Sequence, residues 1–278
     1  MPLSINTNIA SMTAQRSFIN SNASLETAFE RLSTGKRINS AVDDAAGLAI
    51  GKDLESRVSG LNQAIRNVND GISMLQITEG AYDEVTTIVQ RMRDLAVQAV
   101  NGSLTTTEQG YLNTESGKLL TALGSALDQA KFGDVDLVDN SGGTAYLAVI
   151  QSGSEAADLT TLTLSSGTSD DATGLGINAV DISSAAGATS AITAIDTALD
   201  RIATQRASLG AQQAQLESTV RNLSNVAENT SAAAGRIMDT DYAAETANLT
   251  KAQILQQAAT SILAQANAQP QAVLSLLQ

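Results

Sequence analysis

The amino-acid sequence predicts a mainly α-helical protein, in which long antiparallel coiled-coil-like helices from both chain ends flank a small central β-hairpin region. Three observations support this fold class. Apolar residues recur at helical spacing over about 1–133 and again over about 189–268. The only prolines, Pro2 and Pro270, lie at the two edges of the chain. Residues 132–200 contain ten Asp or Glu and no Lys or Arg, so the middle differs in composition from both ends.

The first expected helix begins near the N-terminus and ends near Gly35. Residues 33–40 are rich in Gly, Ser, Thr and Asn, which predicts a bend, and Asp43 or Asp44 is a suitable N-cap for the helix that follows. The largely apolar stripe of the first helix, which includes one arginine, advances in alternating steps of four and three residues. Its members are Ile5, Ile9, Met12, Arg16 and Ile19.

The second expected helix runs from this N-cap to about Val100 and has the most regular pattern in the chain. At ~1.5 Å per residue it would be roughly 85 Å long, which favours a coiled coil over a globular core element. Asn101-Gly102 ends it, and Thr105 with Glu108 forms a capping box for a third helix that extends to about Lys131. The seam of the second helix consists of Leu54, Val58, Leu61, Ile65, Val68, Ile72 and Leu75.

The middle of the chain changes period. Residues 146–150 and 159–164 are short β-like runs between clusters of Gly, Ser and Asp, and they predict a hairpin or small sheet. The concentration of acidic residues there indicates a solvent-facing region.

A heptad pattern returns beyond Gly187 and predicts the other side of the coiled coil. Arg206 and Gln213 interrupt this seam, and polar residues at seam positions often fix the register. After a break at 235–241, Thr240 can cap a last helix that extends to about Ala268. The apolar seam residues are Ile195, Leu199, Ile202, Leu209, Leu216, Val220 and Leu223.

The two terminal segments are amphipathic but rich in Ala, Ser, Asn and Gln. A single helix of this kind is marginal in water, because nucleation is costly and little apolar area is buried. We expect these segments to be disordered alone and to fold when neighbouring subunits bury their stripes. The alternative is that they pair within one chain as a two-helix tail.

Composition removes most enzyme classes. The chain has no His, Cys or Trp, which excludes Ser-His-Asp and Cys-His machinery, His-bearing zinc sites and thiolate metal centres. A carboxylate pair or a carboxylate Mg²⁺ site remains formally possible. Residues 47–53 (GLAIGKD) do not match a phosphate loop, and Asp170-Asp171 lacks the alternating ligands of a calcium loop. We therefore expect no enzymatic activity, no cofactor and no bound metal.

Charge and hydropathy restrict the partners. The formal net charge of −13 disfavours binding to a nucleic-acid backbone. No run approaches 18 apolar residues, so no membrane insertion is expected. The N-terminal residues have neither a basic n-region nor an apolar h-region, so no ordinary secretory signal peptide is expected.

Several long motifs resemble the bacterial flagellin family. They are RLSTGKRINSAVDDAAGLAI at 31–50, QRMRDLAVQ at 90–98, GRIMDTDYAAETANLTKAQILQQAATSILAQAN at 235–267 and PQAVLSLLQ at 270–278. They occur in both helical halves and in the family's order, so together they are more specific than any short pattern. Proteins of the hook–filament junction (hook-associated proteins) share only parts of these ends and are the alternative.

The resemblance implies a structural subunit that polymerises into the helical flagellar filament, the propeller for swimming, after type III export to the cell exterior without a cleaved signal peptide. It further implies that 1–40 with 236–278 form inner terminal helices, and that 41–133 with 189–235 form a shell of long helices. Residues 134–188 would then face outward, in a short form without large outer domains. For inner-tube polymerisation we select Ile5, Ile9, Met12, Ile254, Leu255, Ala258, Ile262 and Leu263.

The resemblance also implies partners: further copies of the chain, sibling flagellins, an export chaperone on the C-terminal segment, and hook-associated and cap proteins. Arg91, Leu95 and Glu115 match family positions that a vertebrate Toll-like receptor contacts, although their primary expected role is subunit packing. Ser and Thr residues over 141–193 could carry O-linked sugars, as in some flagellins, but plain solubility is the favoured explanation for them.

Overall fold

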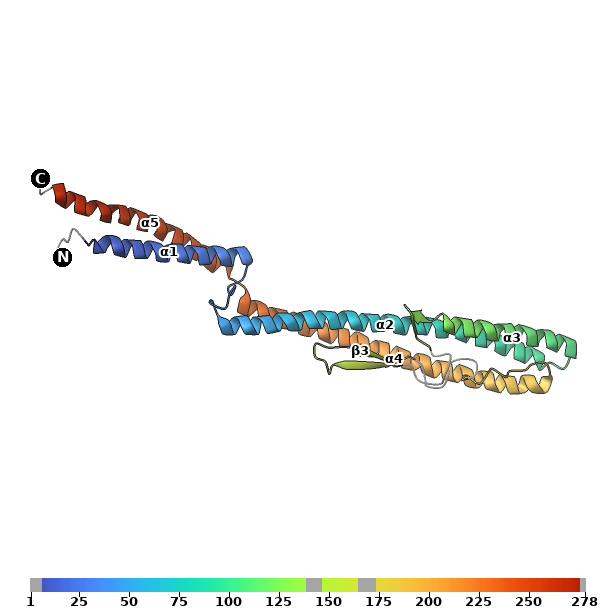
Figure 1. Ribbon diagram of the computed structural model, residues 1–278. Helices are drawn as coiled ribbons and strands as arrows, with labels where there is room; N and C mark the ends of the chain where they lie inside the picture. The colour runs from blue at the N-terminus through green and yellow to red at the C-terminus, as the bar shows by residue number, and fades with distance from the viewer. Residues whose placement is uncertain (1–6, 139–146, 165–173, 276–278) are drawn as a thin grey trace. The chain divides into compact units, whose positions relative to one another are not determined.

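A computed structural model of the protein describes residues 7–138, 147–164 and 174–275 (Figure 1). The described chain is dominated by helices, which confirms the mainly α prediction, and it also contains two short antiparallel hairpins. The helices are α1 (Ile9–Thr34), α2 (Ala45–Ala99), α3 (Thr106–Asp128), α4 (Ala185–Met238) and α5 (Tyr242–Ser275). The hairpins pair β1 (Lys131–Phe132) with β2 (Val135–Asp136), and β3 (Leu147–Gln151) with β4 (Leu159–Thr163).

The chain forms two compact units. Met1–Val58 with Glu228–Gln278 form one, which contains α1, α5 and the segments that lead into them. Ser59–Ala227 form the other, which contains α3, both hairpins and most of α2 and α4. The borders fall inside α2 and α4, whereas the sequence predicts borders at the bends. The three-part division given above stays a prediction.

Three of the expected helix ends have the predicted chemistry. Gly35 ends α1 with a left-handed φ of 72°, and its N–H donates to the Arg31 carbonyl at 2.9 Å. Asp44 precedes α2, and its Oδ1 accepts from the Gly47 N–H at 2.9 Å. The capping box of α3 is present, because the Thr105 side chain accepts from the Glu108 N–H while the Glu108 carboxylate accepts from the Thr105 N–H.

The cap of α5 differs from the prediction. Asp241, rather than Thr240, lies just before the helix, and its Oδ1 accepts from the N–H groups of Ala243 and Ala244. The Thr240 N–H instead donates to the Gly35 carbonyl at 3.0 Å, so Thr240 belongs to the segment between α4 and α5, which is hydrogen-bonded to the end of α1. The helix also continues to Ser275, beyond the expected end near Ala268.

The core of the Ser59–Ala227 unit is a seam between α2, α4, α3 and the β3–β4 hairpin. On α2 the buried positions advance by three and four residues without interruption. This series consists of Leu61, Ala64, Val68, Gly71, Leu75, Thr78, Tyr82, Val85, Val89, Met92, Ala96 and Ala99, and Ile88 and Leu95 beside it are buried as well. Ile65 and Ile72 are only half-buried, because the small residues beside them face the partner elements. The face of α2 that is most buried is therefore the one whose small residues allow the partner elements to pack closely.

The β3–β4 hairpin packs on α2 at a glycine. A Cβ at Gly71 would overlap Cδ1 of Ile150, and it would also lie within 3.4 Å of the Leu162 and Leu216 methyl groups. Amide side chains of α4 satisfy the outer edge of β4. The Thr163 N–H donates to Gln212 Oε1 at 2.8 Å, and Gln212 Nε2 donates back to the Thr163 carbonyl at 3.0 Å. A two-stranded sheet thus gains a substitute for a third strand.

Candidate assembly surface

Helices α1 and α5 lie side by side and contact each other (Figure 1), and the apolar residues that are most buried on them are small. The buried alanines are Ala14 and Ala28 on α1, with Ala252, Ala259 and Ala266 on α5. The seven-residue spacing on α5 is that of a heptad seam. This is the two-helix pairing that the sequence left as an alternative. The coupling of its folding to assembly stays a prediction.

Polar side chains lock the pair in register. Asn8 Nδ2 donates to the Ala266 carbonyl and Ser11 Oγ donates to Asn267 Oδ1, both at 2.7 Å. Closer to the middle, Gln256 Nε2 donates to Asn22 Oδ1 at 3.0 Å. Because each buried alanine contributes little apolar area, these hydrogen bonds carry much of the specificity of the pair.

Many of the large apolar side chains of the same helices remain in solvent, although Phe18, Leu25, Leu32, Leu249 and Leu263 are half-buried. The exposed fraction is 69% for Ile9, 61% for Ile254 and 55% for Ile262, and Met12, Ile19, Phe29 and Leu255 are also exposed. One row of such residues along each of two adjacent helices is more than the scattered exposure of ordinary surfaces. The α1–α5 pair therefore presents an apolar surface that its own chain does not cover.

The residues selected for polymerisation mostly lie on this surface. Ile9, Met12, Ile254, Leu255, Ala258 and Ile262 are exposed, Leu263 is half-buried, and Ile5 lies outside the described residues. Ile19 and Phe29 belong to the exposed set and were not selected. Ile19 is a member of the stripe that the sequence predicts for the first helix, so its spacing already pointed to this surface.

The segment that joins α1 to α2 is hydrogen-bonded to the segment where α4 ends and leads into α5. The Arg37 N–H donates to the Met238 carbonyl at 2.6 Å, and Lys36 and Asp239 form an isolated β-bridge. A Cβ at Gly51 would overlap the Met238 side chain, so α2 begins in close contact with the end of α4. The sequence predicted bends at both segments. It could not predict that they pair, because they lie far apart in the chain and no local pattern marks the contact.

A triad of charged side chains fastens the first linker to α2. Lys36 Nζ lies 2.6 Å from Glu55 Oε1, and Lys52 Nζ lies 2.7 Å from Glu55 Oε2. These hydrogen bonds, first from Lys36 and then from Lys52, lower the pKa of Glu55 from 4.5 to about 2.

We expect the contribution of Glu55 to subunit stability to vanish in acid. Its pKa is lower in the folded state than in the unfolded state, so the contribution is complete above about pH 4.5 and is lost as the pH falls towards 2. The destabilisation caused by Glu55→Gln should therefore shrink over this window, measured as the difference in melting temperature by circular dichroism. The same substitution type at exposed Asp53 (Asp53→Asn) is the control, and a difference that persists at pH 2 would contradict the assignment.

The long helices carry the predicted coiled-coil residues on inward faces. Of the fourteen, eight are buried and six are half-buried. Arg206, the expected polar interruption, reaches across to α2, where its Nη1 lies 2.9 Å from Asp83 Oδ1 and its Nη2 lies 3.9 Å from Glu79 Oε1. The buried members are Leu61, Val68, Leu75, Ile195, Ile202, Leu209, Leu216 and Leu223; the half-buried members are Leu54, Val58, Ile65, Ile72, Leu199 and Val220.

The three residues selected as a receptor contact separate into two groups. Arg91 on α2 and Glu115 on α3 form an exposed ion pair, with 2.7 Å between Arg91 Nη2 and Glu115 Oε1. Leu95 is only 1% exposed and belongs to the core. Leu95 lies about one turn after Arg91 on α2 but faces the core, so its side chain is not accessible for the direct contact that the motif match suggested.

The described residues contain no cluster of three acidic side chains at metal-ligand positions. Residues 47–53 form the first turns of α2, which is helical there and not a phosphate loop. Asp170-Asp171 lies outside the described residues. Within the described ranges, no helix combines the length and the apolar character needed to cross a bilayer.

Comparisons with known proteins agree with this architecture. The family model of the bacterial flagellin N-terminal helical region matches residues 5–142, and that of the C-terminal helical region matches residues 192–277. A flagellin of Halalkalibacterium halodurans is 44% identical over 277 residues, covering 99% of both chains. Flagellin A of Vibrio cholerae is 35% identical over an alignment of 379 residues that covers all of both chains. That alignment is longer than this chain, because the relative carries segments that this short form lacks.

Two solved structures are similar. The crystal structure of Bacillus cereus flagellin superposes with a TM-score of 0.50 at 28% identity, covering 57% of this chain and 88% of that one. A putative flagellar hook-associated protein of Vibrio parahaemolyticus gives a TM-score of 0.57 at 17% identity, covering 71% of this chain and all of that one. The second likeness shows the fold alone. With both terminal regions matched and full-length relatives above 30% identity, the chain belongs to the bacterial flagellin family and is a structural subunit of the bacterial flagellar filament.

Proposed function

We propose that this flagellin polymerises through the apolar surface that its α1–α5 pair leaves in solvent. The observation that carries the proposal is the exposure of Ile9, Met12, Ile254 and Ile262 on adjacent helices whose fully buried apolar residues are alanines. Full burial of one such side chain is worth about 1.5–3 kcal/mol. Because every subunit repeats the same contacts, a few side chains per copy supply enough free energy for a long helical polymer.

The proposal assigns a place to each part of the chain. Residues 1–40 with 236–278 line the inner tube, and 41–133 with 189–235 form the shell that gives stiffness. Residues 134–188 face outward. The charge distribution supports this order, since the acidic residues of 132–200 favour solvent.

Export and capping partners follow from the same surface. An apolar row such as Ile254 and Ile262 would aggregate in the cytoplasm if nothing covered it. We assign this role to an export chaperone on the C-terminal segment before type III secretion. In the assembled filament, copies of the chain, sibling flagellins, and the hook-associated and cap proteins at the filament ends would cover it.

A host Toll-like receptor is a second candidate partner. The exposed Arg91–Glu115 ion pair offers it a charged contact on α2 and α3. Purified monomer should activate reporter cells that carry the receptor, and Arg91→Ala should weaken the response. A silent monomer beside an active reference flagellin would remove the receptor from the list of partners.

Electron microscopy of purified subunit with and without short filament seeds tests the proposed polymerisation. We expect long filaments from the full chain and none from a chain trimmed of residues 1–34 and 242–278, because trimming removes α1 and α5. Circular dichroism of the trimmed chain should still show the helices of the Ser59–Ala227 unit. Equal polymerisation of the trimmed chain would contradict the proposal.

A further inference from the structure

The outward seam of α1 changes chemistry halfway along the helix. We define this seam as the exposed residues that advance by three and four from Ile9 to Glu30. Its first half is largely apolar, and its second half ends in two glutamates one helical turn apart. Its members are Ile9, Met12, Arg16, Ile19, Ala23, Glu26 and Glu30, and every one of them is exposed. A seam that packs in the polymer through its apolar half brings its acidic half to a neighbouring subunit as well.

The two glutamates have no cationic partner within the described chain. Glu26 accepts only one long hydrogen bond, from Asn22 Nδ2 at 3.3 Å, and no described residue bonds to the carboxylate of Glu30. A carboxylate that loses water without gaining a cation or hydrogen-bond donors is strongly destabilising. An assembly that covers the outward seam must therefore supply such a partner.

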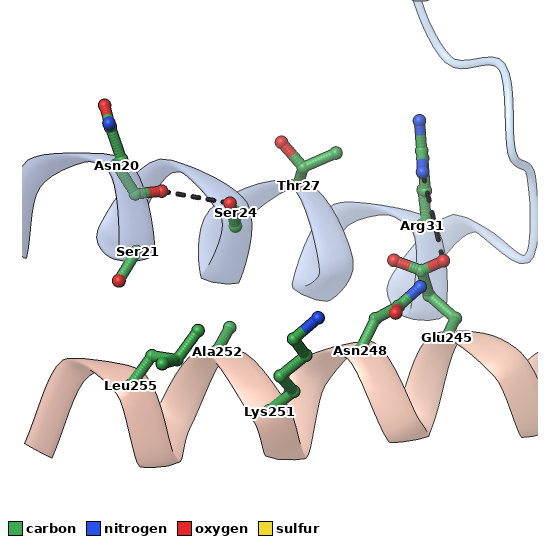
Figure 2. A pocket seen from close by; sticks show the side chains of 10 residues that line it. All are labelled: Asn20, Ser21, Ser24, Thr27, Arg31, Glu245, Asn248, Lys251, Ala252 and Leu255. Carbon is green, nitrogen blue, oxygen red and sulfur yellow. Dashed lines mark hydrogen bonds and ion pairs between the residues drawn. The ribbon is translucent and has the colours of Figure 1, made fainter. Parts of the chain in front are cut away.

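A groove of about 500 Å³ between α1 and α5 carries the opposite charge (Figure 2). Two of its lining residues, Arg31 and Lys251, are cationic, and one, Glu245, is acidic, so one positive charge is unbalanced. The other lining residues are mostly polar and uncharged. The groove is lined by Asn20, Ser21, Ser24, Thr27, Arg31, Glu245, Asn248, Lys251, Ala252 and Leu255.

The cationic side chains of this groove, Arg31 and Lys251, have hydrogen-bond donors that are not fully satisfied by the described residues. Arg31 Nη1 lies 3.9 Å from Glu245 Oε2, which is the outer limit of an ion pair, and Arg31 Nε is buried without a hydrogen-bond partner among the described residues. In Figure 2 the Lys251 side chain extends from α5 towards the α1 side of the groove. Lys251 forms no ion pair within the part of the chain that the structure describes. An additional carboxylate would balance the groove and satisfy these donors.

We propose that Glu30 of one subunit, with Glu26 one turn away, enters the α1–α5 groove of a neighbouring copy and pairs with Lys251 and Arg31. The inference rests on the proposed polymerisation and assigns its polar contact. Two glutamates four residues apart are separated by about 6 Å along the helix axis, whereas the groove extends over about ten residues of each helix, or about 15 Å. The pair therefore fits within its length.

Such a contact would fix the axial register between subunits, which the apolar half of the seam cannot fix alone. Apolar rows tolerate sliding, because burial depends little on direction, whereas a charge pair is satisfied at one register only. The ion pair between copies would thus select one axial position from the several that the apolar side chains permit.

Charge reversal tests the pairing in seeded polymerisation. We expect Glu30→Lys and Lys251→Glu each to raise the critical subunit concentration about tenfold, equivalent to about 1.4 kcal/mol. The double variant should return it to near the wild-type value. Glu228→Lys, which changes net charge as much as Glu30→Lys but lies outside the seam and groove, should have no such effect. Melting curves of all monomers should remain superimposable.

A mixture separates pairing between copies from pairing within one chain. Equal amounts of the Glu30→Lys and Lys251→Glu subunits should polymerise at a lower concentration than either alone, because opposite charges then meet across subunit contacts. Single variants that polymerise like wild type, or a double variant worse than both, would overturn the inference while leaving the proposed function intact. Failure of wild-type subunits to extend seeds would instead overturn the proposed function.

Discussion

Ile262→Asp should abolish polymerisation and leave the fold of the free subunit unchanged. Ile262 is 55% exposed on α5, so an aspartate there is well solvated in the monomer. In the polymer the same carboxylate would be buried in the apolar contact, at a cost of several kcal/mol per subunit. Seeded growth followed by light scattering and electron microscopy should show no filaments, whereas the melting curve by circular dichroism should match wild type.

Gln253→Asp provides the matched control for this substitution. Gln253 is exposed and lies nine residues earlier on the same helix, which places it about half a turn away around the axis. It introduces the same charge on the opposite face and should polymerise nearly normally. If both variants polymerise equally well, or both fail, the apolar row is not the surface that selects the contact.

Leu216→Ala should produce the largest loss of subunit stability among single truncations of the α4 seam. Leu216 has no exposed surface, and one of its methyl groups lies 3.4 Å from the position a Cβ would take at Gly71, where β3, β4 and α2 meet. Removing three carbons from so closely packed a site should cost about 2–5 kcal/mol, because the surroundings cannot collapse around the cavity. Urea unfolding followed by circular dichroism measures this free energy.

Glu217→Ala controls for changes in helix propensity at the neighbouring position. Glu217 is exposed, and its truncation should change the free energy of unfolding by no more than about 0.5 kcal/mol. A loss below about 1 kcal/mol for Leu216→Ala would mean that the hairpin and helices adjust freely there, against the packing described for Gly71.

The elements with local signals could be predicted from the sequence. A left-handed glycine ends α1, a Thr-Glu capping box begins α3, and short β-like runs between clusters of Gly, Ser and Asp form β3 and β4. Each depends on residues within a few positions of one another, so the chain itself carries the information. The long heptad seams were predictable for the same reason, because periodicity identifies an inward face without knowledge of the partner.

Features that depend on distant partners could not be predicted in this way. Asp241 displaced Thr240 as the cap of α5 because Thr240 is needed for the pairing with Gly35. Gln212 supports the edge of β4 from another element, and an exposed-looking glutamine on α4 gives no sign of that role. The β1–β2 hairpin is only two residues long on each side and has no detectable alternation.

The candidate surface was only partly predictable. Amphipathic spacing identified Ile9 and Met12 as members of a stripe, but it could not say whether α5 or another subunit covers them. The structure resolves this for the single chain, because the residues most buried on α1 and α5 are alanines, whereas Ile9 and Met12 remain exposed. Leu95 illustrates the opposite case, in which a motif match selected a residue that packing places in the core.

A side-chain-resolution map of the assembled filament, obtained by electron cryomicroscopy, would show directly whether the exposed apolar side chains of α1 and α5 join the subunits. We expect Ile9, Met12, Ile254 and Ile262 to be buried against neighbouring copies of the chain, with the α1–α5 alanine contact retained within each subunit. A filament in which these four side chains still face solvent, while other surfaces join the subunits, would contradict this expectation.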